Sequence, residues 1–113
     1  MTTFSEYMGD DHARCDHLFA DAEAAIESGD WQQAESTNDK FIEAMQHHFA
    51  MEEEFLFPAF EQATGAEMGP TQVMRHEHEQ MRALFAEMNE AVNNHDADAY
   101  LGSSETLLIL MQQ

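Results

Sequence analysis

The sequence predicts an all-α protein built as an antiparallel up-down-up-down four-helix bundle. Apolar residues recur three and four positions apart nearly throughout the 113 residues, and no run alternates with a period of two. With only 2 prolines and 5 glycines, the chain allows long uninterrupted helices. The connections between the helical patterns are short, which makes neighbouring helices antiparallel. We therefore expect one domain that spans residues 1–113.

The first half of the chain holds two of the four helical segments. The first is expected over residues 3–28, because a Gly-Asp pair at 29–30 then interrupts the pattern. The second is expected over residues 31–64, and Pro58 should kink it or mark a bend near its end.

The second half of the chain holds the other two segments. The third is expected over residues 70–92, after a loop at 65–69, and Pro70 suits the first position of a helix. A turn at 93–96 precedes the fourth segment, which is still apolar when the chain stops at Gln113. We expect this fourth helix to be short or truncated. It would then leave an apolar groove beside the first and third helices, which favours a homodimer.

The charge balance of the chain is strongly acidic. Acidic residues number 23 against 4 basic ones, for a formal net charge of −19 at pH 7. Such a surface repels polyanions, so we expect no binding to nucleic acid or to anionic membranes. No stretch is long and apolar enough to span a membrane, and the N-terminus has no signal-peptide pattern. The single cysteine, Cys15, is typical of a reducing compartment, so we expect a cytoplasmic protein.

One histidine and one glutamate stand four residues apart in the second segment. His48 and Glu52 are separated by about one helical turn, so their side chains share a face. The same face carries Phe41, Met45 and Phe55. A histidine and a carboxylate that point together into an apolar interior are costly without a partner. A metal ion is the natural partner, since imidazole and carboxylate together suit iron, zinc or manganese.

Two more histidines lie on apolar faces of their own helices. The face of His12 also holds Cys15, Phe19 and Ile26, and the face of His78 also holds Met74, Met81, Phe85 and Val92. A single inward histidine is more often a core residue that a backbone carbonyl satisfies. Three of them together with Glu52 favour a metal site at the centre of the bundle. The sequence therefore predicts four metal ligands, which are His12, His48, Glu52 and His78.

Other polar side chains in the same segments are expected to face away from this site. By helical phase these include His17, His47 and His76. Glu53 and Glu54 continue the acidic run, and a solvated face is the expected role for both. Cys15 and the methionines are expected to fill the core rather than to serve as redox or recognition groups.

Three segments carry a resemblance to a known family. They are DHARCDHLF at 11–19, HHFAMEEEFLFPAF at 47–60 and GPTQVMRHEHEQM at 69–81. Together they resemble the hemerythrin-like HHE cation-binding family over the whole chain, and the third is similar to the branch of di-iron repair-of-iron-centres proteins. The resemblance implies a non-haem di-iron centre whose ligands are His12, His48, Glu52 and His78, with Glu52 as the bridge between two irons.

The chain departs from the family pattern at two places. Oxygen-carrying hemerythrins have a second histidine on the third helix, four residues after the first, and here that position is Arg82. The family's fourth helix supplies a histidine and an acidic ligand, and this chain stops at Gln113 before any match to them. We therefore expect the di-iron centre to be incomplete in this chain, with Glu23 as a candidate substitute ligand.

Three functions follow from these observations. The leading one is a non-haem iron-binding bundle that binds or senses O₂, nitric oxide or iron. The second is a di-iron oxidoreductase in oxidative or nitrosative stress or in iron-centre repair. The third is a metal-free helical interaction module. Because the chain shows no nucleophile–base pair and no phosphate-binding loop, we favour a protein that binds a metal and a diatomic ligand over a catalyst.

Overall fold

A computed structural model of the chain describes residues 4–65 and 69–111, and every element in these residues is helical. The elements are α1 (Phe4–Ser28), α2 (Trp31–Met51), the π-helix η1 (Glu52–Leu56), α3 (Phe57–Thr64), α4 (Pro70–Asn93) and α5 (Ala97–Met111). The predicted all-α class is confirmed, and α2, η1 and α3 together make the predicted second segment. Thr3, residues 66–68 of the predicted loop and residues 112–113 lie outside the described residues.

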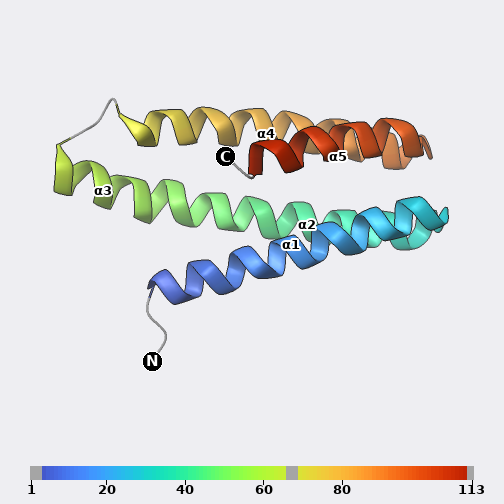
Figure 1. The fold of residues 1–113 in the computed structure, drawn as a ribbon, viewed down its shortest axis with the longest axis horizontal. Coiled ribbons are helices and arrows are strands. Elements are labelled where there is room, and N and C mark those ends of the chain that lie inside the picture. The colour runs from blue at the N-terminus through green and yellow to red at the C-terminus, as the bar shows by residue number, and fades with distance from the viewer. Residues whose placement is uncertain (1–3, 66–68, 112–113) are drawn as a thin grey trace.

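The helices pack as two neighbouring pairs. Helix α1 lies along α2, and α4 lies along α5, while contacts of α2 with α4 and of α1 with α5 join the pairs (Figure 1). Figure 1 also shows α2, η1 and α3 as one long continuous rod, with α5 reaching only part of the way along α4. No helix in the described part of the chain is long and apolar enough to cross a membrane.

Turn chemistry explains where the helices begin and end. The φ of Gly29 is +76° and that of Gly65 is +71°, in the left-handed region that ends a helix at low cost for glycine. The Asp30 side chain then accepts a hydrogen bond from the backbone N–H of Gln33 at 3.2 Å and caps the start of α2. Pro70 is the first residue of α4, where a missing N–H costs nothing.

The core lies between the two helix pairs and contains a buried polar network. Among its largest fully buried side chains are Phe41, Phe85, Met88, Tyr100 and Leu107. The Tyr100 hydroxyl donates to Asn38 Oδ1 at 2.9 Å, and Asn38 Nδ2 donates to Asn89 Oδ1 at 2.8 Å. These two bonds join α5, α2 and α4 at one level, so they fix how the helices align.

A π-helical turn in the long rod changes which side chains face inward. The Phe57 backbone N–H bonds to the Glu52 carbonyl, five residues back instead of four. Pro58 follows immediately, and because its ring crowds the carbonyl four residues earlier and donates no N–H, a wider turn relieves the local conflict. Phe57 is consequently 1 % exposed, whereas Phe55 is 57 % exposed. The prediction that Phe55 shares the inward face of His48 is therefore wrong.

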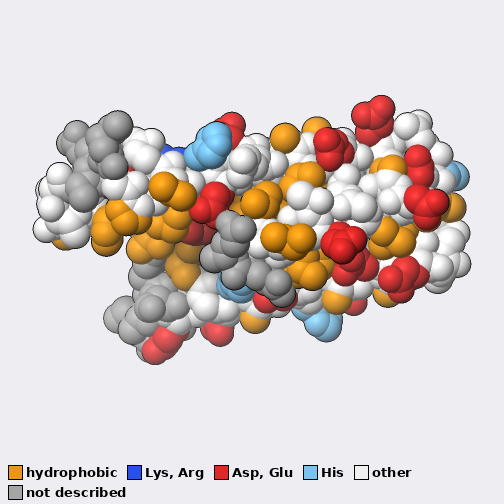
Figure 2. Space-filling view, turned by 45° about the horizontal axis from the view of Figure 1, so that its top comes forward, with side chains coloured by type: hydrophobic (Ala, Val, Ile, Leu, Met, Phe, Trp, Pro, Cys, Tyr) orange, Lys and Arg blue, Asp and Glu red, His pale blue; other side chains and the backbone are white. Residues whose placement is uncertain are grey.

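Apolar side chains are exposed at the α3 end of the molecule. They belong to η1, α3 and the start of α4, and they are Phe55, Leu56, Phe60, Val73 and Met74. Figure 2 shows hydrophobic side chains gathered at this end, with acidic side chains distributed over the rest of the visible face.

Candidate metal centre

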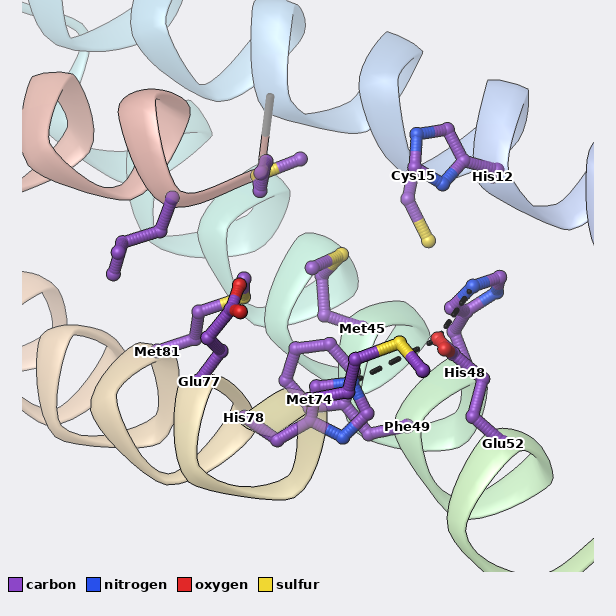
Figure 3. Close-up of a pocket in the computed structure, with 12 residues that line it drawn as sticks. His12, Cys15, Met45, His48, Phe49, Glu52, Met74, Glu77, His78 and Met81 are labelled. Carbon is purple, nitrogen blue, oxygen red and sulfur yellow. Dashed lines mark ion pairs between the residues drawn. The ribbon is translucent and has the colours of Figure 1, made fainter. Parts of the chain in front are cut away.

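Two histidines and one glutamate meet near the junction of α2 and η1. His48 comes from α2, Glu52 is the first residue of η1, and His78 comes from α4. Glu52 Oε1 lies 3.0 Å from His48 Nε2 and 3.8 Å from His78 Nε2. The side chain of Glu52 is 16 % exposed, that of His48 is 9 % exposed and that of His78 is 7 % exposed. One carboxylate oxygen therefore faces two imidazole nitrogens in a nearly dry environment (Figure 3).

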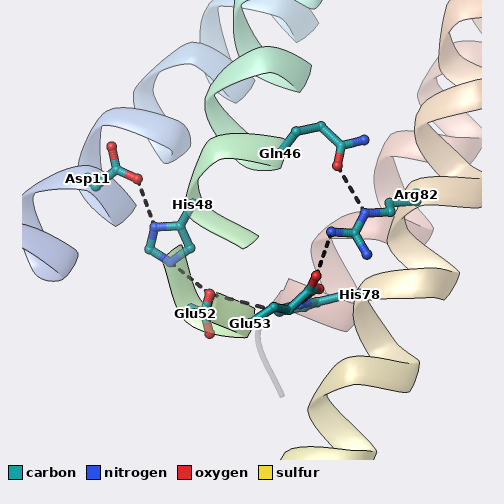
Figure 4. Close-up of polar contacts among 7 residues, drawn as sticks. All are labelled: Asp11, Gln46, His48, Glu52, Glu53, His78 and Arg82. Carbon is teal, nitrogen blue, oxygen red and sulfur yellow. Dashed lines mark hydrogen bonds and ion pairs between the residues drawn. The ribbon is translucent and has the colours of Figure 1, made fainter. Parts of the chain in front are cut away.

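Each of these imidazoles is held from behind by a second carboxylate. His48 Nδ1 lies 2.8 Å from Asp11 Oδ2, and His78 Nδ1 lies 2.6 Å from Glu53 Oε2 (Figure 4). A neutral imidazole that donates from Nδ1 has its lone pair on Nε2, where a metal ion would bind. Metal-binding histidines commonly have such a carboxylate behind them, because it sets the tautomer and the ring orientation.

The two supporting carboxylates are themselves held by arginines. Arg14 donates to Asp11 Oδ1 at 2.7 Å, and Arg82 donates to Glu53 Oε1 at 3.1 Å. Arg82 also donates to Gln46 at 3.0 Å, which fixes the guanidinium between α2 and α4. Both Glu53 and Glu54 were predicted to lie on a solvated face. The prediction is wrong for Glu53 and is confirmed for Glu54, which is exposed. The π-helical turn is the reason, since it lets consecutive glutamates both reach the interior.

Aromatic side chains fix the plane of the His78 ring. The Phe49 ring stacks on it with centroids 4.0 Å apart, and the Phe57 ring lies 5.5 Å away. Phe57 reaches this place because the π-helical turn brings it inward. The stacked rings exclude water from His78 and leave its two nitrogens as the groups through which it forms polar contacts.

The contacts within the site shift the pKa values of His48 and of the two supporting carboxylates toward their charged forms. Glu52 is the main cause that raises the pKa of His48; burial opposes it, and Asp11 adds to it. Burial pushes the pKa of Asp11 upward, but hydrogen bonds from Arg14 and His48 outweigh it and the pKa is lowered. The pKa of Glu53 is lowered in the same way, where Arg82 and His78 outweigh burial. The site thus stabilises a positive charge between its carboxylates.

A cavity of about 220 Å³ adjoins these groups. Its walls come from α1, α2, η1, α4 and α5, and its lining residues are His12, Cys15, Met45, His48, Phe49, Glu52, Met74, Glu77, His78, Met81, Leu110 and Met111. Most of the wall is apolar, and Figure 3 shows these side chains around one common space. The cavity can therefore hold a small ligand next to the imidazole and carboxylate groups.

His12 lines this cavity but is less buried than predicted. Its side chain is 54 % exposed and its Nε2 lies 3.8 Å from Asp16, whereas its ring centroid lies 5.7 Å from that of His48. The residue that points fully inward at this level of α1 is the preceding one, Asp11, which is 6 % exposed. The expectation that His12 points into the core is therefore wrong, and it stands at the edge of the cavity. Its role as a metal ligand stays a prediction.

The remaining polar side chains of the sequence analysis lie away from the cavity lining. His17, His47 and His76 are exposed, in agreement with the helical phase. Glu23 accepts a hydrogen bond from Ser104 at 3.0 Å and does not line the cavity, so its position gives no support to a role as substitute ligand. Cys15 is 2 % exposed, and burial raises the pKa of its thiol to about 11.

The types of donor present fit a divalent transition metal. Within residues 4–65 and 69–111, however, no group of three or more His, Cys, Asp or Glu side chains is placed so that it could hold a metal ion as it stands. Two Nε2 atoms share one carboxylate oxygen, and both rings are anchored at Nδ1. Imidazole and carboxylate donors in this combination suit iron, zinc or manganese. A bound cation would take the place of the proton that links His48 to Glu52.

Two residues of this site were missed by the sequence analysis. Asp11 had a visible signal, because it precedes Cys15 and Phe19 by four and eight positions and so belongs to the apolar face of α1. The sequence carries no such signal for Glu53, because in a regular α-helix its side chain would point about 100° away from that of Glu52.

Comparison with known proteins gives one match. A family model described as the Hemerythrin HHE cation binding domain matches residues 3–112. No significant match to a curated protein or to a solved structure was found.

Proposed function

The chain belongs to the hemerythrin HHE cation-binding domain family, and from this premise we propose that it is a non-haem iron-binding bundle that binds or senses O₂ or nitric oxide. His48, Glu52 and His78 are the central ligands of this proposal, with His12 as a further ligand at the cavity edge. In a dinuclear centre, Glu52 would be the carboxylate that holds both irons. The helical segments form the antiparallel up-down-up-down bundle, and the protein works in the cytoplasm.

One observation carries this proposal. Glu52 Oε1 lies 3.0 Å and 3.8 Å from the Nε2 atoms of His48 and His78, and both rings are tethered at Nδ1 by carboxylates. A histidine that only fills the core needs a hydrogen-bond partner at one ring nitrogen. Here two separate rings are each held at Nδ1, and both direct Nε2 to the same carboxylate, that of Glu52. Such a pair of oriented donors supports metal binding over simple burial.

The cavity supports the choice of a diatomic ligand. Bound iron would supply an open coordination position beside the lining residues. Phe49, Met45 and Met81 form apolar walls there, and the cavity volume of about 220 Å³ leaves room for a small molecule. Apolar walls disfavour charged or strongly hydrated ligands, because these would lose their water without hydrogen bonds in return. The residues thus select for small and weakly polar ligands.

Metal content separates the proposal from a metal-free interaction module. We expect Glu52→Ala to remove most of the iron from protein loaded anaerobically with Fe(II), with helical circular dichroism largely intact. Glu54→Ala is the matched control, since Glu54 lies two residues further along the same turn and is exposed. Full iron content in the Glu52→Ala variant, or equal loss in both variants, would show that Glu52 is not a ligand.

Turnover separates a binder from an oxidoreductase. The iron-loaded protein should give a stable spectral adduct with O₂ or nitric oxide, at a fixed stoichiometry per chain. Continuous consumption of oxidant beyond that stoichiometry would instead favour the di-iron oxidoreductase. The homodimer expected from the sequence stays a prediction, which sedimentation of the iron-loaded and metal-free protein would test.

A further inference from the structure

Sulfur-bearing side chains are concentrated on one cavity. The chain has nine methionines and one cysteine, and five of these ten residues line the cavity of the candidate metal centre. They are Cys15, Met45, Met74, Met81 and Met111, and they come from α1, α2, α4 and α5. Sulfur donors are a poor match for the imidazole and carboxylate chemistry of iron, so they require their own explanation.

Three of these sulfurs face the same part of the cavity. Figure 3 shows the sulfur atoms of Cys15, Met45 and Met74 turned toward the space that the His12 and His48 rings also face. Cys15 and Met45 are 2 % and 4 % exposed, so their positions are fixed by the surrounding core. Met74 is 37 % exposed and stands with the half-exposed His12 where solvent reaches the cavity. The arrangement offers two buried donors inside and two partly exposed donors at the opening.

We propose that this sulfur-lined side of the cavity is a binding site for Cu(I). Its donors are the Cys15 sulfur, the Met45 and Met74 thioethers and the His12 imidazole. The Cys15 thiol would release its proton to solvent as the ion binds, because the metal takes the thiolate. Thiolate and thioether ligands select soft cations, and Cu(I) is the one that accepts neutral thioethers readily. The formal net charge of −19, with Glu77 in the cavity wall, attracts cations to this place. Copper would thus use three sulfur donors that the iron proposal does not use, and the two metals would share only His12.

Gap filling is the alternative explanation of the methionines, since their flexible side chains adapt to irregular spaces. The two explanations differ in what the sulfur atom itself contributes. Met→Leu substitution nearly conserves volume and apolar character but removes the donor atom. Under gap filling, a leucine at position 45 or 74 leaves copper binding unchanged, whereas under the proposal it weakens binding.

The test is an anaerobic titration of the metal-free protein with Cu(I) buffered by a chromophoric Cu(I) chelator. We expect one Cu(I) per chain, with Met45→Leu and Met74→Leu each lowering the affinity about tenfold or more, since even groups that only support a ligand cost ten- to a hundredfold. Met88→Leu is the matched control, because Met88 is fully buried in the core and does not line the cavity. X-ray absorption of the copper-loaded protein should show sulfur neighbours.

Three results would overturn the Cu(I) site. They are retention of all copper by the chelator, equal affinities of the Met45→Leu, Met74→Leu and Met88→Leu variants, and a copper spectrum with only nitrogen and oxygen neighbours. Circular dichroism of each variant establishes that it is folded before titration. The Glu52→Ala variant separates this inference from the iron proposal, because it should lose iron and keep Cu(I).

Discussion

Replacement of Asp11 by Asn tests whether the carboxylate behind His48 controls metal binding. The Asp11 side chain is 5 % exposed and its Oδ2 lies 2.8 Å from Nδ1 of the 9 % exposed His48. The amide of Asn keeps the size of the side chain and removes the charge. Nδ1 then faces a neutral amide, whose oxygen is a weaker acceptor than a carboxylate. The tautomer of His48, and the direction of its Nε2 toward the metal position beside Glu52, are therefore held less firmly.

The size of the effect follows from the hydrogen bond that is weakened. A hydrogen bond to a charged group contributes about 1.5–3 kcal/mol, and about 1.4 kcal/mol corresponds to a tenfold change in an equilibrium constant. We therefore expect Asp11→Asn to bind Fe(II) about ten- to a hundredfold more weakly, which agrees with the usual cost of losing such a supporting group. The measurement is anaerobic competition with a chelator of known affinity.

Asp10→Asn is the matched control for this experiment. It makes the same charge change one residue earlier, on an exposed side chain, and so reproduces any long-range effect of net charge. Its affinity for Fe(II) should match that of the parent protein, because exposed charges are screened by solvent and salt. The reasoning fails if Asp11→Asn binds iron as tightly as the parent, or if Asp10→Asn loses as much.

Two further predictions concern the metal-free fold. Tyr100→Phe removes the 2.9 Å hydrogen bond to Asn38 inside the core. The free energy of unfolding should therefore fall by about 1–2 kcal/mol and the thermal midpoint by several degrees, with no change in iron affinity. An unchanged midpoint would contradict the structural role of this network. The pKa of His48 is raised above 6.5, chiefly by Glu52, so the stability that protonated His48 contributes should be fully present below pH 6.5 and lost as pH rises through the raised value. Urea midpoints of the metal-free protein should therefore fall as the pH rises above 6.5. His48→Gln should flatten that fall, and an equal fall in the variant would mean that other groups cause it.

The helical segments could be predicted from the sequence because their signals are local. Apolar residues repeat with the helical period, and Gly29, Gly65 and Pro70 mark the chain positions where a helix stops or starts. Each of these signals acts within one turn of helix, so tertiary packing does not have to be known. The boundaries observed in the described residues accordingly lie within a residue or two of those predicted.

The site could be predicted only as far as the helix stays regular. His48 and Glu52 were found because an α-helix holds residues four apart on one face, and this holds up to the end of α2. Beyond that point the π-helical turn inserts one extra residue, so Phe55 rotates outward while Glu53 and Phe57 rotate inward. Local sequence showed a proline at 58, but not that the chain would form a π-helical turn just before it.

The basic residues of the chain explain why the supporting carboxylates remain charged. Two ordered series of contacts converge on Glu52, one from Arg14 through Asp11 to His48 and one from Arg82 through Glu53 to His78. A buried carboxylate that lacks a cation takes up a proton and can no longer accept from an imidazole as strongly. The chain has only 4 basic residues against 23 acidic ones, and these two arginines are half of them. Exposed ion pairs contribute little to stability, so the value of these two lies in keeping both imidazoles oriented toward one carboxylate.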